Sequence, residues 1–159
     1  AGTGVLNLDL SLQSTVTAFP TSLTFGAGGG TLGGAQTGDY DQFALTNTGT
    51  SPETYVVFSV PYDVAPPLRF AAAPGDRSPA SSFTLTLNPG QTKTLYAYWT
   101  TAAPLLAGQY QGQIVVAGSK SPAGIGIPYW YGVPSGIPSS VFPMNPPAAR
   151  CGVAPSAAT

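Results

Sequence analysis

The side chains that could support acid–base, nucleophilic or metal chemistry are few in this sequence. Histidine is absent, and the single cysteine, Cys151, lies in a segment rich in proline and alanine. A Ser-His-Asp triad, a Cys-His pair or a His-ligated metal site therefore cannot be built from this chain alone. Cys151 also has no second cysteine with which to form an internal disulfide. We predict that the chain is not an enzyme and has no catalytic residues.

Acidic residues are the remaining candidates for binding a ligand. The chain has six Asp and Glu in total, and Asp39, Asp41 and Glu53 flank one predicted strand and its turn. A calcium site needs several oxygen ligands that converge at about 2.3–2.6 Å, and these acids lack the spacing of an EF-hand loop. We expect solvated acids at strand ends, no metal and no cofactor, with a calcium site at these acids as the alternative.

Gly28, Gly30 and Gly33 match the G-x-G-x-x-G pattern of dinucleotide-binding folds, and a predicted strand precedes them. In those folds a helix begins at this loop, and its N-terminus holds the pyrophosphate. No helical periodicity follows here, because the next structured run is the strand that begins at Tyr40. The sequence therefore predicts a surface loop rather than a cofactor site.

Charge is scarce: charged side chains make up 7% of the sequence and the net charge is -1. The chain has neither the basic surface that nucleic acids require nor a polybasic segment for a membrane surface. No apolar run approaches the roughly 18 residues of a membrane-spanning helix. We expect no nucleic-acid partner and no membrane span. Solubility must rest on Thr, Ser, Gln and Asn, and this composition favours a secreted or cell-surface location.

Alternation of apolar and polar residues with a period of two predicts β-strands along most of the chain. The central pair is expected within residues 39–60, as a hairpin with a polar turn at residues 47–52. Pro20 should break the strand near the N-terminus, and the run NPGQ at residues 88–91 suits a type II turn. A tyrosine corner is expected at Tyr110, whose hydroxyl would bond to the backbone upstream of it.

About seven strands, with turns roughly every 8–12 residues, predict an all-β fold, an immunoglobulin- or fibronectin-III-like antiparallel β-sandwich. Glycine and proline, 20 and 17 in number, separate the strands rather than forming one tract. One face of each strand should supply the core. The predicted core residues are Leu23, Phe25, Phe43, Leu45, Val56, Phe58, Phe83, Leu85, Leu95, Trp99, Ile114, Val116, Ile125 and Ile127.

Five segments occur in an order that resembles the fibronectin-III-like domain found after the catalytic domain of bacterial subtilisin-like serine peptidases. They are TVTAFPTSLTFG, FALTNTGTSPETY, LTLNPGQTKTLYAYW, AGQYQGQIVV and IPYWYGVP. Near the N-terminus, GTGVLNLDLSL resembles the segment that closes the subtilisin-like catalytic domain. The family's catalytic Asp, His and Ser motifs are absent, so no catalytic residue carries over. Sperm-protein-like and chaperone-like sandwiches share turns of the NTG type and are the alternative.

The resemblance implies three parts of the chain. Residues 1–14 would be a linker or the end of an upstream catalytic domain, residues 15–134 the β-sandwich, and residues 135–159 a Pro/Ser/Ala-rich linker or tail. The implied partner is a neighbouring domain of the same polypeptide, a protease catalytic domain. The implied role is that of an accessory module that stabilises, spaces or positions this domain in an exported peptidase. The alternative function is a cell-surface module that binds carbohydrate or protein.

Two sets of aromatic residues are candidate binding surfaces. Tyr96 and Tyr98 share one face of a predicted strand and could form a platform for carbohydrate, although cross-strand packing also explains them. On the last strand, Trp130 shares a face with Pro128 and two glycines, which indicates an outward face. Large exposed indoles are typical of interfaces. We therefore predict that Pro128 and Trp130 dock against a neighbouring domain, unless a β-bulge near Pro128 turns Trp130 into the core.

Overall fold

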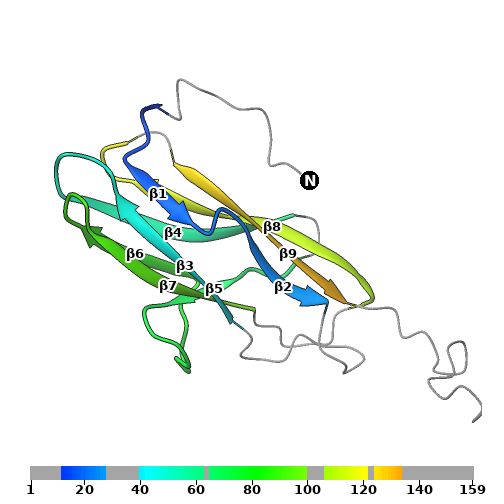
Figure 1. Cartoon of the computed structure of the whole chain (residues 1–159). Coiled ribbons are helices and arrows are strands. Elements are labelled where there is room, and N and C mark those ends of the chain that lie inside the picture. The colour runs from blue at the N-terminus through cyan, green and yellow to red at the C-terminus, as the bar shows by residue number, and fades with distance from the viewer. Residues whose placement is uncertain (1–11, 28–39, 63–64, 100–105, 122–123, 134–159) are drawn as a thin grey trace, which may run out of the picture.

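Two β-sheets pack face to face (Figure 1). The computed structural model describes residues 12–27, 40–62, 65–99, 106–121 and 124–133. No helix among these residues is long and apolar enough to cross a membrane. The strands in these ranges are β1 (Val16–Phe19), β2 (Leu23–Ala27), β3 (Tyr40–Asn47), β4 (Glu53–Pro61), β5 (Arg69–Ala71), β6 (Ser82–Leu87), β7 (Thr92–Tyr98), β8 (Gly108–Gly118) and β9 (Ile125–Val133).

The strand order is β1-β3-β7-β5 in the four-stranded sheet and β2-β9-β8-β4-β6 in the five-stranded sheet. The named pairs are antiparallel except for β2 with β9, which are parallel. The predicted all-β sandwich is confirmed. It has nine described strands rather than about seven, because Pro20 divides the first predicted strand and a short β5 forms around Phe70.

β1 and β2 belong to different sheets although only residues 20–22 separate them. Proline has no N–H to donate to a strand ladder, and Pro20 lies at this crossover, after a cis peptide bond with Phe19. The predicted break at Pro20 is confirmed. As a result, the chain forms one edge of the four-stranded sheet with β1 and then one edge of the five-stranded sheet with β2.

β3 and β4 do not form the predicted hairpin, because they lie in opposite sheets. The backbone N–H of Asn47, the last residue of β3, donates to the carbonyl of Gln91 at 3.1 Å, and its carbonyl accepts from the N–H of Gly90 at 2.8 Å. The Asn47 side chain donates to the carbonyl of Leu87 at 2.9 Å. These bonds hold the end of β3 against the β6–β7 turn, so the chain crosses to the other sheet before β4 begins.

The inward face of β4 is the opposite of the predicted one. Tyr55 and Val57 are fully buried, whereas Val56 and Val60 are 38% and 37% exposed and Phe58 is half-buried. Both faces of this strand carry apolar residues, so alternation alone does not decide which one faces the core. Tyr55 explains the outcome, because its hydroxyl hydrogen-bonds to polar groups where one end of the sandwich closes.

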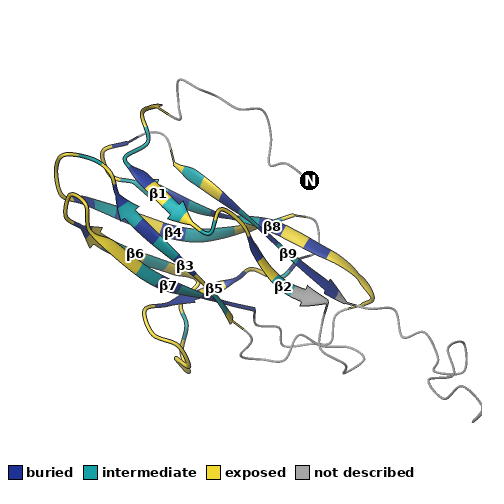
Figure 2. Cartoon of the chain, in the orientation of Figure 1, coloured by how far each residue is buried: buried dark blue, intermediate teal, exposed yellow. Residues whose placement is uncertain are grey.

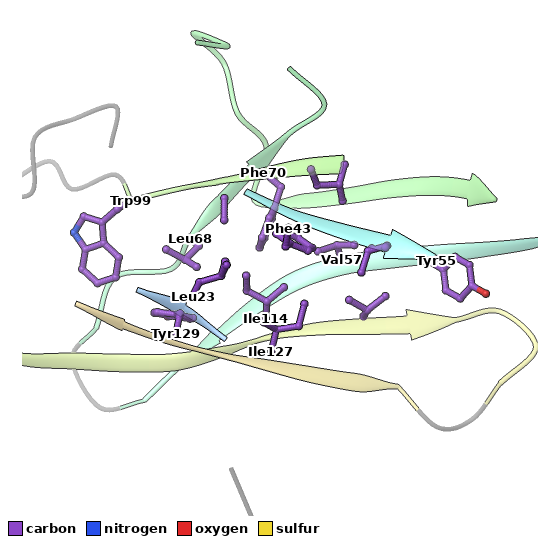
Figure 3. Close-up of a cluster of buried hydrophobic side chains, with 14 of the residues drawn as sticks. Leu23, Phe43, Tyr55, Val57, Leu68, Phe70, Trp99, Ile114, Ile127 and Tyr129 are labelled. Carbon is purple, nitrogen blue, oxygen red and sulfur yellow. The ribbon is translucent and has the colours of Figure 1, made fainter. Parts of the chain in front are cut away.

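The core lies between the sheets, and buried and exposed residues alternate along most strands (Figure 2). Figure 3 shows the buried cluster, with Tyr55 at one end and Trp99 at the other. The predicted core residues found buried are Leu23, Phe43, Leu45, Leu95, Trp99, Ile114, Val116 and Ile127. Those that are partly buried and pack against them are Phe25, Phe83, Leu85 and Ile125. The prediction missed Tyr55, Val57, Leu68 and Phe70, all of which are fully buried.

Two predicted turns are confirmed. Gly90 has φ = 72°, the left-handed conformation that a type II turn requires at its third position, and the N–H of Gln91 donates to the carbonyl of Asn88 at 2.9 Å. The hydroxyl of Tyr110 donates to the carbonyl of Leu106 at 2.8 Å, which is the predicted tyrosine corner. Both bonds fix loops whose ends enter strands of the core.

Candidate functional site

A carboxylate is buried where one end of the sandwich closes. Glu53, the first residue of β4, is 3% exposed. Its Oε2 accepts from the Thr15 hydroxyl at 2.6 Å, and its Oε1 accepts from the backbone N–H groups of Lys120 and Ser121 at 2.8 and 3.0 Å. The Tyr55 hydroxyl lies 3.4 Å from Oε2 and donates at 3.0 Å to the carbonyl of Thr15. We call Thr15, Glu53, Tyr55, Lys120 and Ser121 the polar end.

Neutral donors hold the charge of Glu53. Burial raises the pKa of Glu53, but the hydrogen bonds from Thr15, Lys120, Ser121 and Tyr55 together outweigh burial and keep this pKa below its ordinary value. The ammonium group of Lys120 donates to the carbonyl of Pro52 at 2.7 Å rather than to the carboxylate. The carboxylate therefore joins the start of β1, the start of β4 and the β8–β9 connection.

The polar end is a structural clamp rather than a cation site, because both oxygens of Glu53 already accept hydrogen bonds from protein donors. Asp41 lies on β3, and its Oδ1 accepts the N–H of Gln42 at 2.8 Å. Asp39 is outside the described residues. Within the described part of the chain, no group of three or more His, Cys, Asp or Glu could hold a metal ion. Because the calcium alternative includes Asp39, it stays a prediction.

Aromatic rings gather at the opposite end of the core. Trp99 stacks on Tyr131, with ring centroids 4.8 Å apart and planes at 28°. Phe25, Tyr110 and Tyr129 meet the indole at tilted or edge-on angles, with centroids 5.9, 6.4 and 6.1 Å away. Both kinds of geometry are favourable for aromatic pairs. We call these five residues the aromatic end.

The Tyr129 hydroxyl shows that packing dominates at the aromatic end. This hydroxyl is buried and has no hydrogen-bond partner among the described residues, as is also true of Nε1 of Trp99. Burial, with a smaller contribution from Tyr62, raises the pKa of Tyr129 to about 12. A Cβ at Gly112 would lie 2.5 Å from this hydroxyl oxygen and 2.7 Å from the carbonyl of Val60. Glycine at this position therefore makes room for the tyrosine.

Trp130 and Pro128 lie on the outer face of the five-stranded sheet, and both are half-buried. In the β8–β9 pair, Trp130 is opposite Gln111 and Pro128 is opposite Gln113, in a register that continues without a shift along β9. The residues before and after Trp130 are buried in the core. This pair therefore has no β-bulge near Pro128 to turn the indole inward. The docking of Pro128 and Trp130 against another domain stays a prediction.

More apolar side chains share this outer face, and the sequence reasoning either assigned them to the core or did not single them out. Phe58 of β4 is opposite Val115 of β8, and Val60 is opposite Gln113. The described outward residues of this sheet carry no charge. The sequence signal that could have revealed these outward residues is the equal apolar content of the two faces of β4. We define the outer patch as Val56, Phe58, Val60, Val115, Pro128 and Trp130.

The two tyrosines predicted to form a platform differ in exposure. Tyr98 is 2% exposed, and its hydroxyl donates to the carbonyl of Ala73 at 3.0 Å and accepts from the N–H of Asp76 at 3.2 Å. Tyr96 is half-buried and meets Tyr40 edge-on, with centroids 5.6 Å apart. Tyr40 is 47% exposed. A binding platform on this face would therefore consist of Tyr40 and Tyr96 rather than Tyr96 and Tyr98.

Two further predictions fall outside the described residues: the glycine-rich run at residues 28–33 and the single Cys151. The proposed division into residues 1–14, 15–134 and 135–159 also stays a prediction. The described strands begin at Val16 and end at Val133, within the central part.

No protein-family model matches the sequence, and no curated protein matches it. Among solved structures, the E. coli chaperone DraB shares 14% identity over 75% of this chain and 55% of DraB, with a TM-score of 0.50. The CooA pilin subunit of enterotoxigenic E. coli shares 16% over 77% of this chain and 100% of CooA, at 0.44. The secreted serine protease VesC of Vibrio cholerae shares 14% over 74% of this chain and 23% of VesC, at 0.42.

The likeness to DraB concerns the fold alone, because sequence identity is low and the chain spans little more than half of that protein. It agrees with the two-sheet topology described above. The chain is an immunoglobulin-like β-sandwich of the kind that DraB contains.

Proposed function

We propose that this chain is a non-catalytic module of an exported protein and that it positions a neighbouring domain through the outer patch. The ordered motifs that resemble the domain following subtilisin-like catalytic domains support a peptidase as that neighbour. The sparse charge and the many Thr, Ser and Gln residues support export. The role is mechanical: the module holds, spaces or stabilises the domain on which the chemistry takes place.

One observation carries the proposal: the half-buried indole of Trp130 lies on the outer face of β9, on a sheet face without described charges. Trp130 lies between Gln111 of β8 and Thr24 of β2, and Pro128 shares its face of β9, so uncharged polar side chains border an apolar centre. Interfaces have this arrangement, in which an aromatic anchor lies within a rim of neutral polar groups. Surfaces that face water permanently carry more charge than this.

The test compares this 159-residue chain with the longest polypeptide that its natural coding sequence specifies. Amide hydrogen exchange in β8 and β9 should be slower in the long form, and Trp130→Ala should remove the difference. The matched control is Phe19→Ala, because Phe19 is 78% exposed on the four-stranded sheet. Equal exchange in the long and short forms, or an equal effect of both variants, contradicts the proposal.

A binding module is the second candidate, favoured by Tyr40 and Tyr96. Their rings meet at 78° and Tyr40 is 47% exposed, which leaves an open aromatic face that could stack on a sugar. A glycan array should then give a hit that Tyr40→Ala or Tyr96→Ala abolishes and Trp130→Ala leaves intact. A hit lost with Trp130→Ala, or no hit at all, argues against this platform.

A further inference from the structure

A groove of about 330 Å³ lies between β1 of one sheet and the first half of β9 of the other. Its lining residues are all uncharged: Ser14, Val16, Thr17, Ala18, Thr21, Ile125, Gly126 and Ile127. We propose that this groove binds a short, extended, uncharged peptide segment of a partner protein, which adds a strand at the open edge of β9 or β1. This inference does not rest on the outer patch or on the proposed accessory role.

One wall of the groove is an open strand edge. The N–H of Thr48 on the β3 side donates to the carbonyl of Thr15 at 2.9 Å, and the β1–β3 register is antiparallel. Backbone groups of alternate residues point the same way along a strand, so Thr17 also points toward β3. Val16 and Ala18 then point their N–H and C=O groups away from β3, toward the groove. The Ser14 hydroxyl donates to the carbonyl of Val16 and accepts from its N–H. The backbone N–H and C=O of Ala18 are therefore the open groups on this edge.

The opposite wall is also an open edge. The N–H of Tyr62 donates to the carbonyl of Gln111 at 2.9 Å, so the backbone groups of Gln111 point toward β4. Those of its neighbour Gly112 then point toward β9. Gly112 is opposite Tyr129, and alternation then turns Gly126 and Pro128 away from β8. Proline at an outward position fits, because its missing N–H costs nothing in the β8–β9 ladder.

β2 occupies this side of β9 only farther along. Its register joins Leu23 to Tyr129 and Thr24 to Trp130, in parallel. In a parallel pair with this register, the carbonyl of Pro128 faces Leu23 of β2. The backbone groups of Gly126 continue the same edge without a described strand beside them. Unpaired donors and acceptors at strand spacing are met by another extended backbone. A charged side chain would find no opposite charge in the lining, so the segment should be uncharged.

The volume sets the length of the segment. A groove of about 330 Å³ lies at the lower end of the range of small-ligand pockets. It suits a few residues with small apolar or hydroxyl side chains rather than a long strand. Affinity should come mainly from backbone hydrogen bonds, since little apolar area is available.

The first experiment asks whether the edges are open in the free chain. Amide exchange measured by NMR should show Ala18 and Gly126 unprotected, while Thr17 and Ile127, which point into the ladders, are protected. Protection of Ala18 and Gly126 without a peptide would mean that another part of this chain fills the groove, and the proposal would be wrong.

The second experiment identifies the ligand class. A phage-displayed library of random heptapeptides is selected on the immobilised chain and, in parallel, on Ala18→Pro, which removes the groove-facing N–H and spares the bonds to β3. Phe19→Ala is the control, because that side chain is exposed on the outer face. Uncharged, alternating sequences should be enriched on the wild type and on the control but not on Ala18→Pro. No enrichment, or equal enrichment on all three proteins, overturns the proposal.

The third experiment separates strand addition from ordinary apolar binding. The enriched heptapeptide is synthesised in its natural form and with alternate amides N-methylated, which removes donors without changing the side chains. The peptide whose methylated amides face the strand edge of the groove should bind about tenfold more weakly than the natural form, because it has lost backbone hydrogen bonds. Equal affinity of both peptides shows that side chains alone are recognised and contradicts strand addition.

Discussion

The two ends of the sandwich are closed by different physical means. At the polar end, the carboxylate of Glu53 and the hydroxyl of Tyr55 make directional bonds to backbone and side-chain groups within 2.6–3.4 Å. At the aromatic end, Trp99 is held by ring contacts, and its Nε1 is buried without a hydrogen-bond partner among the described residues. Substitutions at the polar end are limited by the geometry of its hydrogen bonds, and substitutions at the aromatic end by the volume of its side chains.

This difference assigns distinct roles to the ends. The polar end joins segments far apart in the sequence, since Thr15 and Lys120 bond to the same carboxylate. It therefore determines where strands start. The aromatic end contributes buried area, which stabilises the fold without specifying a particular partner. Substitutions that remove area should be most costly at the aromatic end, and substitutions that change protonation should act at the polar end.

The largest expected effect is that of Trp99→Ala. The indole is fully buried and contacts four other rings, so its removal leaves a large cavity that the rigid strands cannot fill. We expect a loss of about 3–5 kcal/mol in the free energy of unfolding, measured by urea denaturation. A loss below about 1.5 kcal/mol would mean that the aromatic end collapses around the gap and is less rigid than proposed.

The sequence predicted the aromatic end better than the polar end, for a physical reason. Phe25 and Trp99 follow simple alternation, and burial of apolar residues is what alternation reports. Glu53 is a charged residue that ordinary expectation places in water. Its burial depends on donors from Thr15 and Lys120, which are far away in sequence. Local patterns carry no information about such partners.

The crossing between β3 and β4 could not be predicted for the same reason. A polar turn between two alternating runs is typical of a hairpin, and the side chain of Asn47 looked like an ordinary turn residue. In the structure it donates to the carbonyl of Leu87, a bond formed only after the chain has folded. Because β4 then joined the other sheet, the choice of its inward face rested on Tyr55 rather than on Val56.

The second prediction concerns acid. The pKa of Glu53 is held below its ordinary value of 4.5, so the carboxylate stabilises the fold fully above pH 4.5, and this stability is lost as the pH falls through the lower folded-state pKa. Glu53→Gln keeps the shape but not the charge. At pH 7 it should cost about 1–3 kcal/mol, the value of hydrogen bonds to a charged group.

The measurement is urea denaturation of both proteins between pH 7 and pH 3. The gap between wild type and Glu53→Gln should shrink as the pH falls below 4.5, because the wild-type carboxyl becomes neutral. Asp41→Asn is the control, since Oδ1 of Asp41 accepts a local hydrogen bond from the N–H of the neighbouring Gln42. A gap that stays constant with pH would show that the charge of Glu53 contributes nothing.

The third prediction uses one substitution at both ends. Tyr55→Phe removes a hydroxyl that donates to the carbonyl of Thr15 at 3.0 Å, and it should cost about 1 kcal/mol. Tyr129→Phe removes a buried hydroxyl without a described partner, and it should be neutral or slightly stabilising. Urea denaturation of the two variants at pH 7 compares the ends directly. Equal losses would remove the distinction between them.

The stability of the fold at high pH is a second test of the burial of Tyr129. Its pKa is raised from 10.0 to about 12, because burial disfavours the phenolate and Tyr62 adds to the effect. The neutral form therefore stabilises the fold below pH 10, and that contribution is lost as the pH rises through about 12. Tyr129→Phe should flatten this alkaline loss of stability, whereas a substitution of an exposed residue, such as Phe19→Ala, should not.

The last prediction concerns Trp130→Ala, the same change of side chain as at Trp99 but with a much smaller expected loss. Trp130 is half-buried on the outer face, and its neighbours across the strands are Gln111 and Thr24 rather than core residues. Its removal opens no enclosed cavity, so the isolated chain should lose less than about 1 kcal/mol in the free energy of unfolding. Urea denaturation of Trp99→Ala, Trp130→Ala and the double variant measures both values and their additivity.

Additivity is the sharper part of this last test. The buried Tyr129 and Tyr131 stand on either side of Trp130 in β9, and both contact Trp99, so the two tryptophans are linked through one strand. If Trp130 serves only the outer patch, its loss should add to that of Trp99→Ala within about 0.5 kcal/mol. A loss near 3 kcal/mol for Trp130→Ala alone, or strong coupling in the double variant, would show that the indole belongs to the aromatic end. Trp130 would then not be available on the outer patch to bind a neighbouring domain.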